Sequence, residues 1–183
     1  MKTCYLFLAE GFEEIEALTV VDLLRRDQIP VQMVSVDGTP YVKGSHEIEV
    51  KADCTMQDVD LVNACMLVLP GGMPGTENLF ANEALRKMVL DFHKTNRRIA
   101  AICAAPSILG RWGILQGKKA VCYPGREEML EGATVLKDEV VTDGNITTSR
   151  GMGTAIAFGL EIIKLLDCET EAGAMKSKII YRQ

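Results

Sequence analysis

Short apolar runs alternate with longer amphipathic segments along this chain, and this alternation constrains the fold more than any other feature. The apolar runs typical of buried strands lie at residues 2–8, 31–36, 66–69 and 98–102. Segments with apolar residues at helical spacing lie at residues 14–26, 82–95, 104–111 and 154–166. Strands that alternate with helices predict a mostly parallel sheet covered by helices on both faces. We therefore expect an α/β fold.

Weaker signals predict additions to that sheet. Residues 41–51 alternate apolar and polar side chains around Gly44-Ser45, which predicts a hairpin. Further short strands are expected at residues 120–123, 134–136, 140–142 and 146–148, followed by the helix of 154–166 and a short tail. At 183 residues the chain is long enough for a full hydrophobic core, and it contains no linker or repeat. We expect a single domain over 1–183.

Charge and hydropathy argue against nucleic acid and membranes as partners. The net charge is −5, long basic runs are absent, and Arg25-Arg26, Arg97-Arg98 and Lys118-Lys119 are isolated pairs. The apolar run at the N-terminus is too short for a signal peptide, and no run approaches the roughly 20 apolar residues of a membrane span. We expect a cytoplasmic protein.

The cysteines and histidines do not form a pattern typical of metal sites. Six cysteines occupy positions 4, 54, 65, 103, 122 and 168, and none belongs to a C-x-x-C pair. With no export signal, we expect all six to be reduced thiols. The histidines are His46 and His93 alone, so we expect no zinc site. No motif requires another cofactor, because Leu-Pro-Gly-Gly (69–72) lacks the pattern of a phosphate-binding loop.

Chemistry-bearing residues gather where three of the expected strands end. An acidic segment (9–16) follows the first strand, Leu-Pro-Gly-Gly (69–72) ends the strand at 66–69, and Cys103 follows the strand at 98–102. In open α/β sheets, ligands bind outside the carboxyl ends of the strands. The sequence therefore predicts a functional site at this edge.

Cys103 is the candidate nucleophile of that site. It lies between a strand and a helix, where helix N–H groups favour the thiolate. The alternative is a buried free cysteine without a chemical role. The backbone N–H groups of Gly72 and Ala104 are candidates for an oxyanion hole, although Gly72 is also explained by a simple tight turn.

Glu16 is the candidate acid and base. The acidic residues near the start of the first helix are explained by the helix dipole. A glutamate buried beside a cysteine would instead be pushed toward its protonated form, and it would then donate a hydrogen bond to a thiolate. Ala104, rather than a histidine, follows the cysteine, so the chain does not favour a conventional cysteine hydrolase.

Four motifs together resemble the ThiJ/PfpI superfamily, in the branch of the Parkinson-linked protein deglycase and the bacterial YajL-type proteins. They are Gly-Phe-Glu-Glu-Ile-Glu (11–16), Leu-Pro-Gly-Gly (69–72), Ala-Ala-Ile-Cys-Ala-Ala-Pro (100–106) and Thr-Ser-Arg-Gly-Met-Gly-Thr (148–154). The resemblance implies a flavodoxin-like three-layer sandwich with a nucleophile elbow at Cys103 and a partner carboxyl at Glu16. It implies that the amides of Gly72 and Ala104 line the pocket. It also implies a homodimer with the first helix near the two-fold axis.

Two positions depart from the family pattern. Arg26 and His46 match positions that are both arginine in the human member, where they bind anions near the cysteine. With a histidine at position 46, anion binding is expected to be weaker and pH-dependent. Tyr123 stands where that member has a histidine that contributes to the cysteine site, and tyrosine is a poor base near neutral pH. Glu16 is therefore the leading acid/base group.

Three functions follow from the resemblance. The first is a cysteine-dependent enzyme of glyoxalase III or deglycase type, a hydro-lyase or hydrolase that acts on small reactive dicarbonyls or glycated adducts during oxidative stress. The second is a non-catalytic redox sensor or chaperone that acts through oxidation of Cys103. The third is a peptidase or amidase, for which the chain lacks a histidine beside the cysteine.

Overall fold

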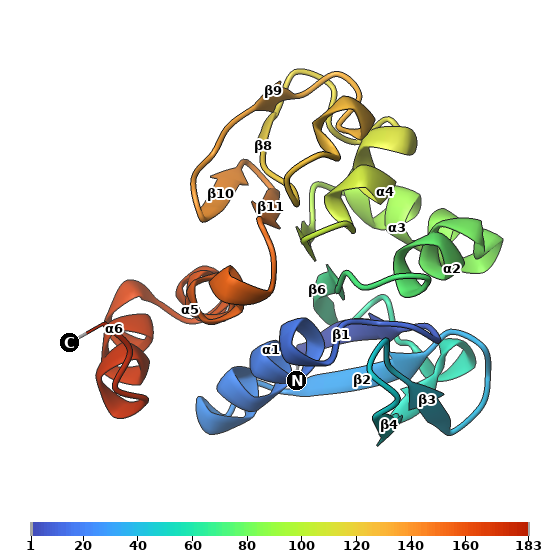
Figure 1. The fold of residues 1–183 in the computed structure, drawn as a ribbon. Helices are drawn as coiled ribbons and strands as arrows, with labels where there is room; N and C mark the ends of the chain where they lie inside the picture. The colour runs from blue at the N-terminus through green and yellow to red at the C-terminus, as the bar shows by residue number, and fades with distance from the viewer. Residues whose placement is uncertain (1, 183) are drawn as a thin grey trace.

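A central sheet organises the structure (Figure 1), a computed structural model that describes residues 2–182. Its seven strands follow the order β10-β11-β7-β6-β1-β2-β5. Their bounds are Thr3–Leu8 for β1, Val31–Ser35 for β2, Cys54–Thr55 for β5, Ala64–Leu69 for β6, Arg98–Ile102 for β7, Val140–Asp143 for β10 and Ile146–Ser149 for β11. All neighbours pair in parallel except β10 and β11. The predicted α/β fold with a mostly parallel sheet is confirmed.

Helices cover the two faces of the sheet and give the three layers of the sandwich. On one face lie α1 (Glu14–Arg26), α5 (Ala155–Leu166) and α6 (Glu169–Lys178); on the other lie α2 (Gly75–Ala81), α3 (Glu83–Lys94) and α4 (Pro106–Arg111) (Figure 1). Alternate residues of β1 enter the two layers: Cys4, Leu6 and Leu8 pack with the first group, whereas Tyr5 and Phe7 pack with the second. This alternation explains why the central strands are apolar throughout.

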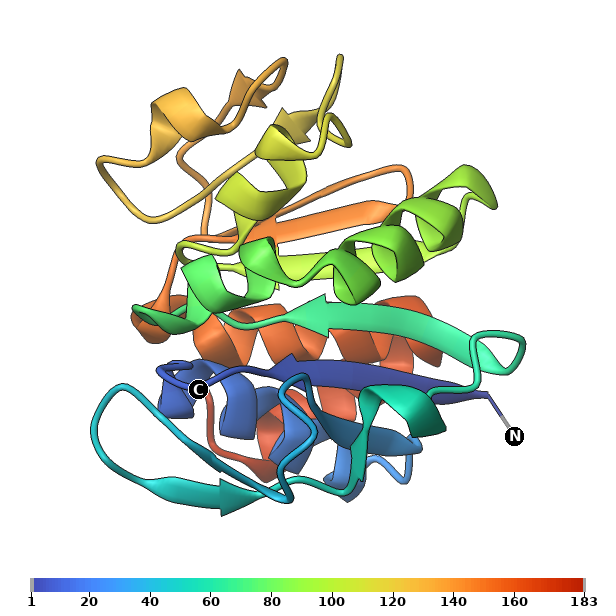
Figure 2. The same cartoon turned by 90° about the vertical axis from the view of Figure 1, so that its right-hand side faces the viewer.

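The carboxyl ends of the central strands meet at one edge. Figure 2 shows β1 and β6 side by side and pointing the same way, as their parallel register requires. Strand β7 pairs with β6 and runs parallel to it. The segments after these three strands therefore lie together, as the sequence predicted.

The smaller elements differ from the sequence prediction in several places. Helices α2 and α6 were not predicted, because one starts in a Gly/Pro-rich segment and the other has no apolar stripe. The strand expected at 120–123 is shorter: β8 spans Lys119–Ala120 and pairs with β9 (Thr134–Val135). The backbone amide of Val121, the residue after β8, donates to the side-chain Oγ1 of Thr148 at 3.0 Å rather than to a neighbouring strand. The predicted hairpin is present as β3 (Tyr41–Lys43) and β4 (Glu49–Lys51). Single-turn 3-10 helices occur at Met56–Asp58, Glu127–Met129 and Met152–Thr154.

Helix α1 has two apolar surfaces rather than the single one expected. The core takes Val20, Val21 and Leu24, whereas Ile15 is 49% exposed. Glu16, by contrast, is 1% exposed. The helix thus buries a carboxyl at its first turn and leaves an apolar residue outside.

Two further sequence expectations concern the cysteines and membrane-spanning helices. All six cysteines are free thiols, as predicted. Among the described residues, no helix has the length and apolarity needed to cross a membrane.

Candidate active site around Cys103

Cys103 lies on a tight elbow directly after β7. Its φ angle is +65°, in the left-handed region that non-glycine residues seldom adopt. Hydrogen bonds hold the elbow: the Cys103 amide donates to the carbonyl of Ser149 at 2.9 Å, and its carbonyl accepts from the amide of Tyr123 at 2.8 Å. The turn lets the side chain project away from the sheet edge.

The carboxyl of Glu16 reaches the same point from α1. Its Oε2 accepts a 2.9 Å hydrogen bond from the amide of Gly71. Its Oε1 is buried and accepts no hydrogen bond from any described nitrogen or oxygen. The same carboxyl lies beside Cys103, because Oε2 of Glu16 and Cβ of Cys103 are both 2.7 Å from the position that a Cβ on Gly71 would take.

Glycines allow this close approach. A Cβ atom at Gly71 would lie 2.7 Å from both the Cβ of Cys103 and Oε2 of Glu16, so any side chain there would push the pair apart. Gly72 has φ +94°, and a Cβ on it would lie 2.3 Å from the amide nitrogen of Glu13. The Pro70-Gly71-Gly72 turn is therefore needed for packing as well as for chain reversal.

Two backbone amides act on the sulfur electrostatically. The N–H groups of Gly72 and Ala104 lower the pKa of the Cys103 thiol, because they stabilise the thiolate. The structure thus brings together the four residues that the sequence analysis placed in one pocket: Cys103, Glu16, Gly72 and Ala104. An oxyanion hole formed by the two amides stays a prediction.

The electrostatics of the pair differ from the sequence expectation. Burial raises the pKa of Glu16 to about 7, because a carboxylate loses its hydration at this depth. Burial and the charge of Glu16 raise the pKa of the Cys103 thiol, against the two amides that lower it. The sequence argument considered only the amides. Since ionisation of either group disfavours ionisation of the other, the two titrate as a pair, and the carboxyl loses its proton before the thiol does.

Comparison with known proteins places this geometry in a family. The sequence pattern of the DJ-1/PfpI family matches residues 2–165. The chain belongs to the DJ-1/PfpI family. It is 33% identical over 185 residues to the Parkinson disease protein 7 homolog of Danio rerio, a match that covers 99% of this chain and 98% of that protein.

Two further matches, one to a plant relative and one to a solved structure, cover nearly all of this chain. Protein DJ-1 homolog A of Arabidopsis thaliana is 38% identical over 184 residues, but this match covers 99% of the present chain and only 47% of the plant protein. The chain thus spans about half the length of that relative. The solved structure titled Toxoplasma gondii DJ-1, oxidized, has a TM-score of 0.95 and 33% identity, with both chains covered completely.

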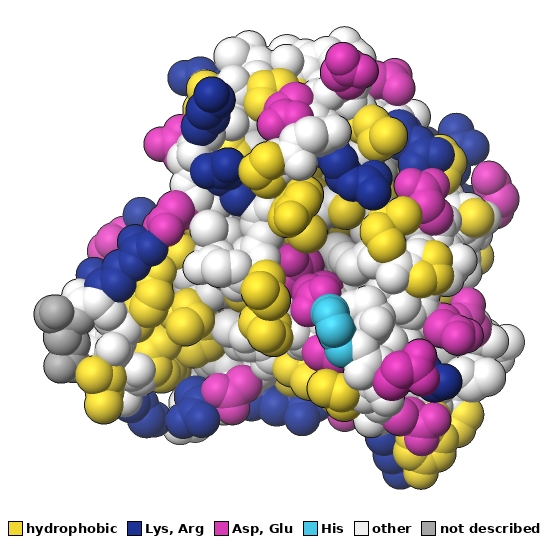
Figure 3. Space-filling model, in the orientation of Figure 1, with side chains coloured by type: hydrophobic (Ala, Val, Ile, Leu, Met, Phe, Trp, Pro, Cys, Tyr) yellow, Lys and Arg dark blue, Asp and Glu magenta, His cyan; other side chains and the backbone are white. Residues whose placement is uncertain are grey.

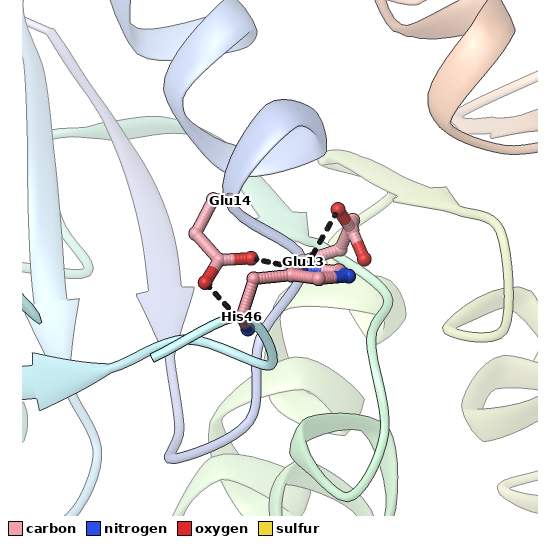
Figure 4. Close-up of side chains that lie close together, drawn as sticks. All are labelled: Glu13, Glu14 and His46. Carbon is pink, nitrogen blue, oxygen red and sulfur yellow. Dashed lines mark hydrogen bonds and ion pairs between the residues drawn. The ribbon is translucent and has the colours of Figure 1, made fainter. Parts of the chain in front are cut away.

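Arg26 and His46 each lie beside a carboxylate in the single chain. Nε of Arg26 is 2.5 Å from a carboxylate oxygen of Asp22 one turn earlier on α1. Nδ1 of His46 is 3.0 Å from Glu14 and 3.7 Å from Glu13 (Figure 4). An anion would have to compete with these carboxylates, and the anion site that the family resemblance implied stays a prediction.

The hairpin between β3 and β4 carries His46 to the start of α1. The amide of Ser45 donates to the carbonyl of Phe12 at 2.8 Å, and the amide of His46 donates to Oε1 of Glu14 at 2.8 Å. Ligand atoms of Glu13, Glu14 and His46 lie within 4.8 Å of one another, close enough for a shared cation. The hydrogen bond with Glu14 and the charges of Glu13 and Glu14 raise the pKa of His46. The absence of a metal site stays a prediction.

Tyr123 lies beside the elbow. A Cβ atom on Gly151 would lie 3.3 Å from the Tyr123 ring and 3.8 Å from the Cys103 sulfur. Gly151 was not among the predicted site residues, although the motif at 148–154 contains it. This glycine keeps the space between the sulfur and the ring open, and the Tyr123 side chain remains 52% exposed.

Proposed function

We propose that this DJ-1/PfpI protein is a cysteine-dependent enzyme that acts on small reactive dicarbonyls or their early adducts on amines and thiols. The observation that carries the proposal is the position of buried Glu16 beside Cys103 at the elbow, where Oε2 of the one and Cβ of the other are both 2.7 Å from the position of a Cβ on Gly71. The pair supplies a nucleophile and a carboxyl that can move a proton. Dicarbonyl isomerisation uses both groups, because a proton has to move between two adjacent carbons.

The proposed reaction with methylglyoxal proceeds in four steps. The Cys103 thiolate adds to the aldehyde carbon, and protonated Glu16 gives its proton to the resulting alkoxide, which forms a hemithioacetal. Glu16 carboxylate then removes the hydrogen from that carbon, which forms an enediolate. Glu16 returns this proton to the neighbouring carbon, and the hydroxyl proton passes to the other oxygen, which gives a lactoyl thioester on Cys103. Glu16 carboxylate takes a proton from water as the resulting hydroxide cleaves the thioester, so that Cys103 leaves as the thiolate, Glu16 is protonated again, and lactic acid departs as lactate with one proton lost to solvent.

The pocket supports this chemistry better than peptide hydrolysis. Among the described residues, His46 interacts with Glu13 and Glu14. Nδ1 of His93 lies 3.4 Å from the side-chain nitrogen Nδ2 of Asn145. Neither contact involves Cys103. An amine leaving group needs a general acid at a suitable place, and only Glu16 is placed beside the sulfur.

Lactate formation from methylglyoxal tests the proposal. We expect Cys103→Ser to abolish lactate formation and Glu16→Gln to reduce it by about two orders of magnitude, the usual contribution of a general acid/base. Cys168→Ser changes an exposed thiol elsewhere and serves as the control. Lactate production by Cys103→Ser at the wild-type rate would rule out the mechanism.

The same pocket supports a redox role as a second candidate. The amides of Gly72 and Ala104 and the carboxyl of Glu16 are placed to stabilise oxygen atoms added to the sulfur. Peroxide would oxidise the thiolate to a sulfenic acid with loss of water, and a second peroxide would give the sulfinic acid. Intact-mass measurement after mild peroxide should show a gain of two oxygens that is absent in Cys103→Ser and kept in Cys168→Ser. A gain of the same size in Cys103→Ser would place the oxidation elsewhere.

We also propose a homodimer through the outer side of α1. An open groove there is lined by Ile15, Leu18, Ile48, Ile156 and Ile179. Ile15 and Ile48 are 49% and 53% exposed in the single chain. A contiguous apolar groove on a surface helix is typical of a protein interface.

A further inference from the structure

The charges around the Cys103 pocket are predominantly acidic. Figure 3 shows acidic side chains and a histidine at a central hollow of the surface, with hydrophobic side chains around it. Glu13, Glu14 and Glu16 come from one turn at the start of α1, and His46 is the cation paired with the first two. Two carboxyl groups therefore face one imidazole, and the third, that of Glu16, is buried beside Cys103.

Glu13 connects this acidic cluster to the reacting sulfur. Its amide donates to the carbonyl of Gly71 at 2.9 Å, and Gly71 in turn binds Glu16 and packs against Cys103. The Glu13 side chain is 15% exposed, so it is accessible from the hollow. Its charge also acts on Glu16. Burial is the main cause that raises the pKa of Glu16, and the negative charge of Glu13 raises this pKa further.

Cationic side chains do not offset this charge at the sulfur. The charged groups that shift the pKa values of Cys103 and Glu16 are Glu16 and Glu13 themselves. Arg126 and Arg150 act instead on Cys122. Burial raises the pKa of that thiol to about 11, and the charges of the two arginines oppose this rise. Arg26 is held by Asp22 on α1. These three arginines thus act on groups other than Cys103 and Glu16.

We propose that the pocket selects its reaction partners by charge, admitting neutral carbonyl compounds and oxidants and excluding those that carry a carboxylate, with Glu13 as the selecting residue. A carboxylate brought into a partly dehydrated pocket would meet like charges on Glu13 and Glu16 without a free cation to pair with. The part of this inference that concerns substrates rests on the proposed dicarbonyl activity. The part that concerns access to the sulfur does not.

Alkylation of Cys103 measures charge selection without any enzymatic activity. Iodoacetamide and iodoacetate both lose iodide to the thiolate and have nearly the same size, but only iodoacetate is charged. Rates at Cys103 are followed by peptide mass spectrometry and divided by the rates of each reagent with 2-mercaptoethanol. We expect iodoacetate to be disfavoured at Cys103 by about tenfold at low ionic strength, with the ratio falling toward that of the free thiol as salt is added.

Variants identify the selecting residue. Glu13→Gln should bring the iodoacetate-to-iodoacetamide ratio most of the way to that of the free thiol. Glu83→Gln removes one negative charge from a side chain that is 79% exposed at the start of α3, and it should keep the wild-type ratio. An unchanged ratio in Glu13→Gln would overturn the role of Glu13. A wild-type ratio equal to that of the free thiol, or a preference for iodoacetate, would overturn charge selection altogether.

Substrate turnover gives the second readout. 4,5-Dioxopentanoate is a dicarbonyl with a distant carboxylate, and its methyl ester is the neutral counterpart. We expect the ester to be converted with a kcat/KM about tenfold higher than the acid, and Glu13→Gln to reduce that preference. Equal kcat/KM values for the acid and the ester would overturn the substrate part of the inference. Failure to convert either compound would overturn the dicarbonyl activity, while the alkylation ratio would still decide whether charge controls access to Cys103.

Discussion

The amide of Gly71 donates a 2.9 Å hydrogen bond to Oε2 of Glu16 across a gap of 55 residues in sequence. This bond fixes Oε2 of the carboxyl beside Cys103, since Oε2 and Cβ of Cys103 are both 2.7 Å from the position of a Cβ on Gly71. It also joins the end of β6 to the first turn of α1. The position of the proton donor beside Cys103 thus depends on a backbone group in a glycine turn.

Gly71→Ala should separate the catalytic pair. The new Cβ would lie 2.7 Å from both Cys103 and Glu16, and neither neighbour has free space to retreat in a close-packed pocket. We expect a loss of about 1–3 kcal/mol in the free energy of unfolding and a larger loss of lactate formation. Urea denaturation and the lactate assay measure the two effects.

Gly153→Ala is the matched control for that substitution. Nothing lies within 4 Å of a Cβ at this position, which is also close in sequence to the pocket. Unfolding and activity should both remain near the wild-type values. Equal effects of the two substitutions would show that the tight packing around Gly71 is unimportant.

Glu16→Gln should stabilise the protein more at alkaline than at acidic pH. Burial raises the folded-state pKa of Glu16 from 4.5 to about 7. Between these values the unfolded chain releases the proton while the folded protein keeps it, so wild-type stability falls as pH rises and levels off above pH 7. Glutamine carries no charge, so its advantage should grow from pH 5 to pH 8 by up to about 3 kcal/mol.

Urea unfolding at pH 5, 6, 7 and 8 measures this difference. Glu128→Gln, a change in an exposed residue, is the control and should show no comparable dependence on pH. A stability difference between Glu16→Gln and wild type that stays constant over this range would contradict the raised pKa.

Local patterns were sufficient to predict the central strands and the elbow, but not the two-residue edge strand β5. After Arg98 the residues of β7 are apolar up to Ile102, and the small residues that follow favour a turn into α4. The end of each parallel strand is a local feature, and parallel pairing brings those ends to one edge. Cys103 and the turn at 70–72 could therefore be placed in one pocket from the sequence.

Contacts distant in sequence explain what could not be predicted. His46 reaches Glu14 because the hairpin returns to Phe12, and periodicity contains no information about that return. The outward position of Ile15 depends on how α1 rotates against the sheet, since the helix has apolar residues on two sides. The raised pKa of the thiol depends on burial and on Glu16, neither of which an isolated strand-to-helix turn reveals.

Ile15→Glu should weaken the proposed dimer. The substitution places a charge in the apolar groove along α1, where burial against a second copy would require its desolvation. We expect sedimentation velocity to show a shift from dimer to monomer at micromolar concentration. Val62→Glu is the control, because Val62 is 88% exposed and does not line the groove, and it should sediment as the wild type does. Dimers of unchanged stability in Ile15→Glu would exclude this face.

The two histidines should titrate in opposite directions from the ordinary value. The hydrogen bond with Glu14, together with the charges of Glu13 and Glu14, raises the pKa of His46 above 6.5. Burial and the nearby Lys118 lower the pKa of His93 below it. Because the chain contains only these two histidines, NMR of their ring protons resolves both titrations, and His93→Gln assigns them. Glu14→Gln should lower the pKa of His46 toward 6.5 and leave that of His93 unchanged. If His46 titrates at or below 6.5 in the wild type, the imidazole does not carry the charge that balances Glu13 and Glu14 near neutral pH, and those carboxylates need another cation.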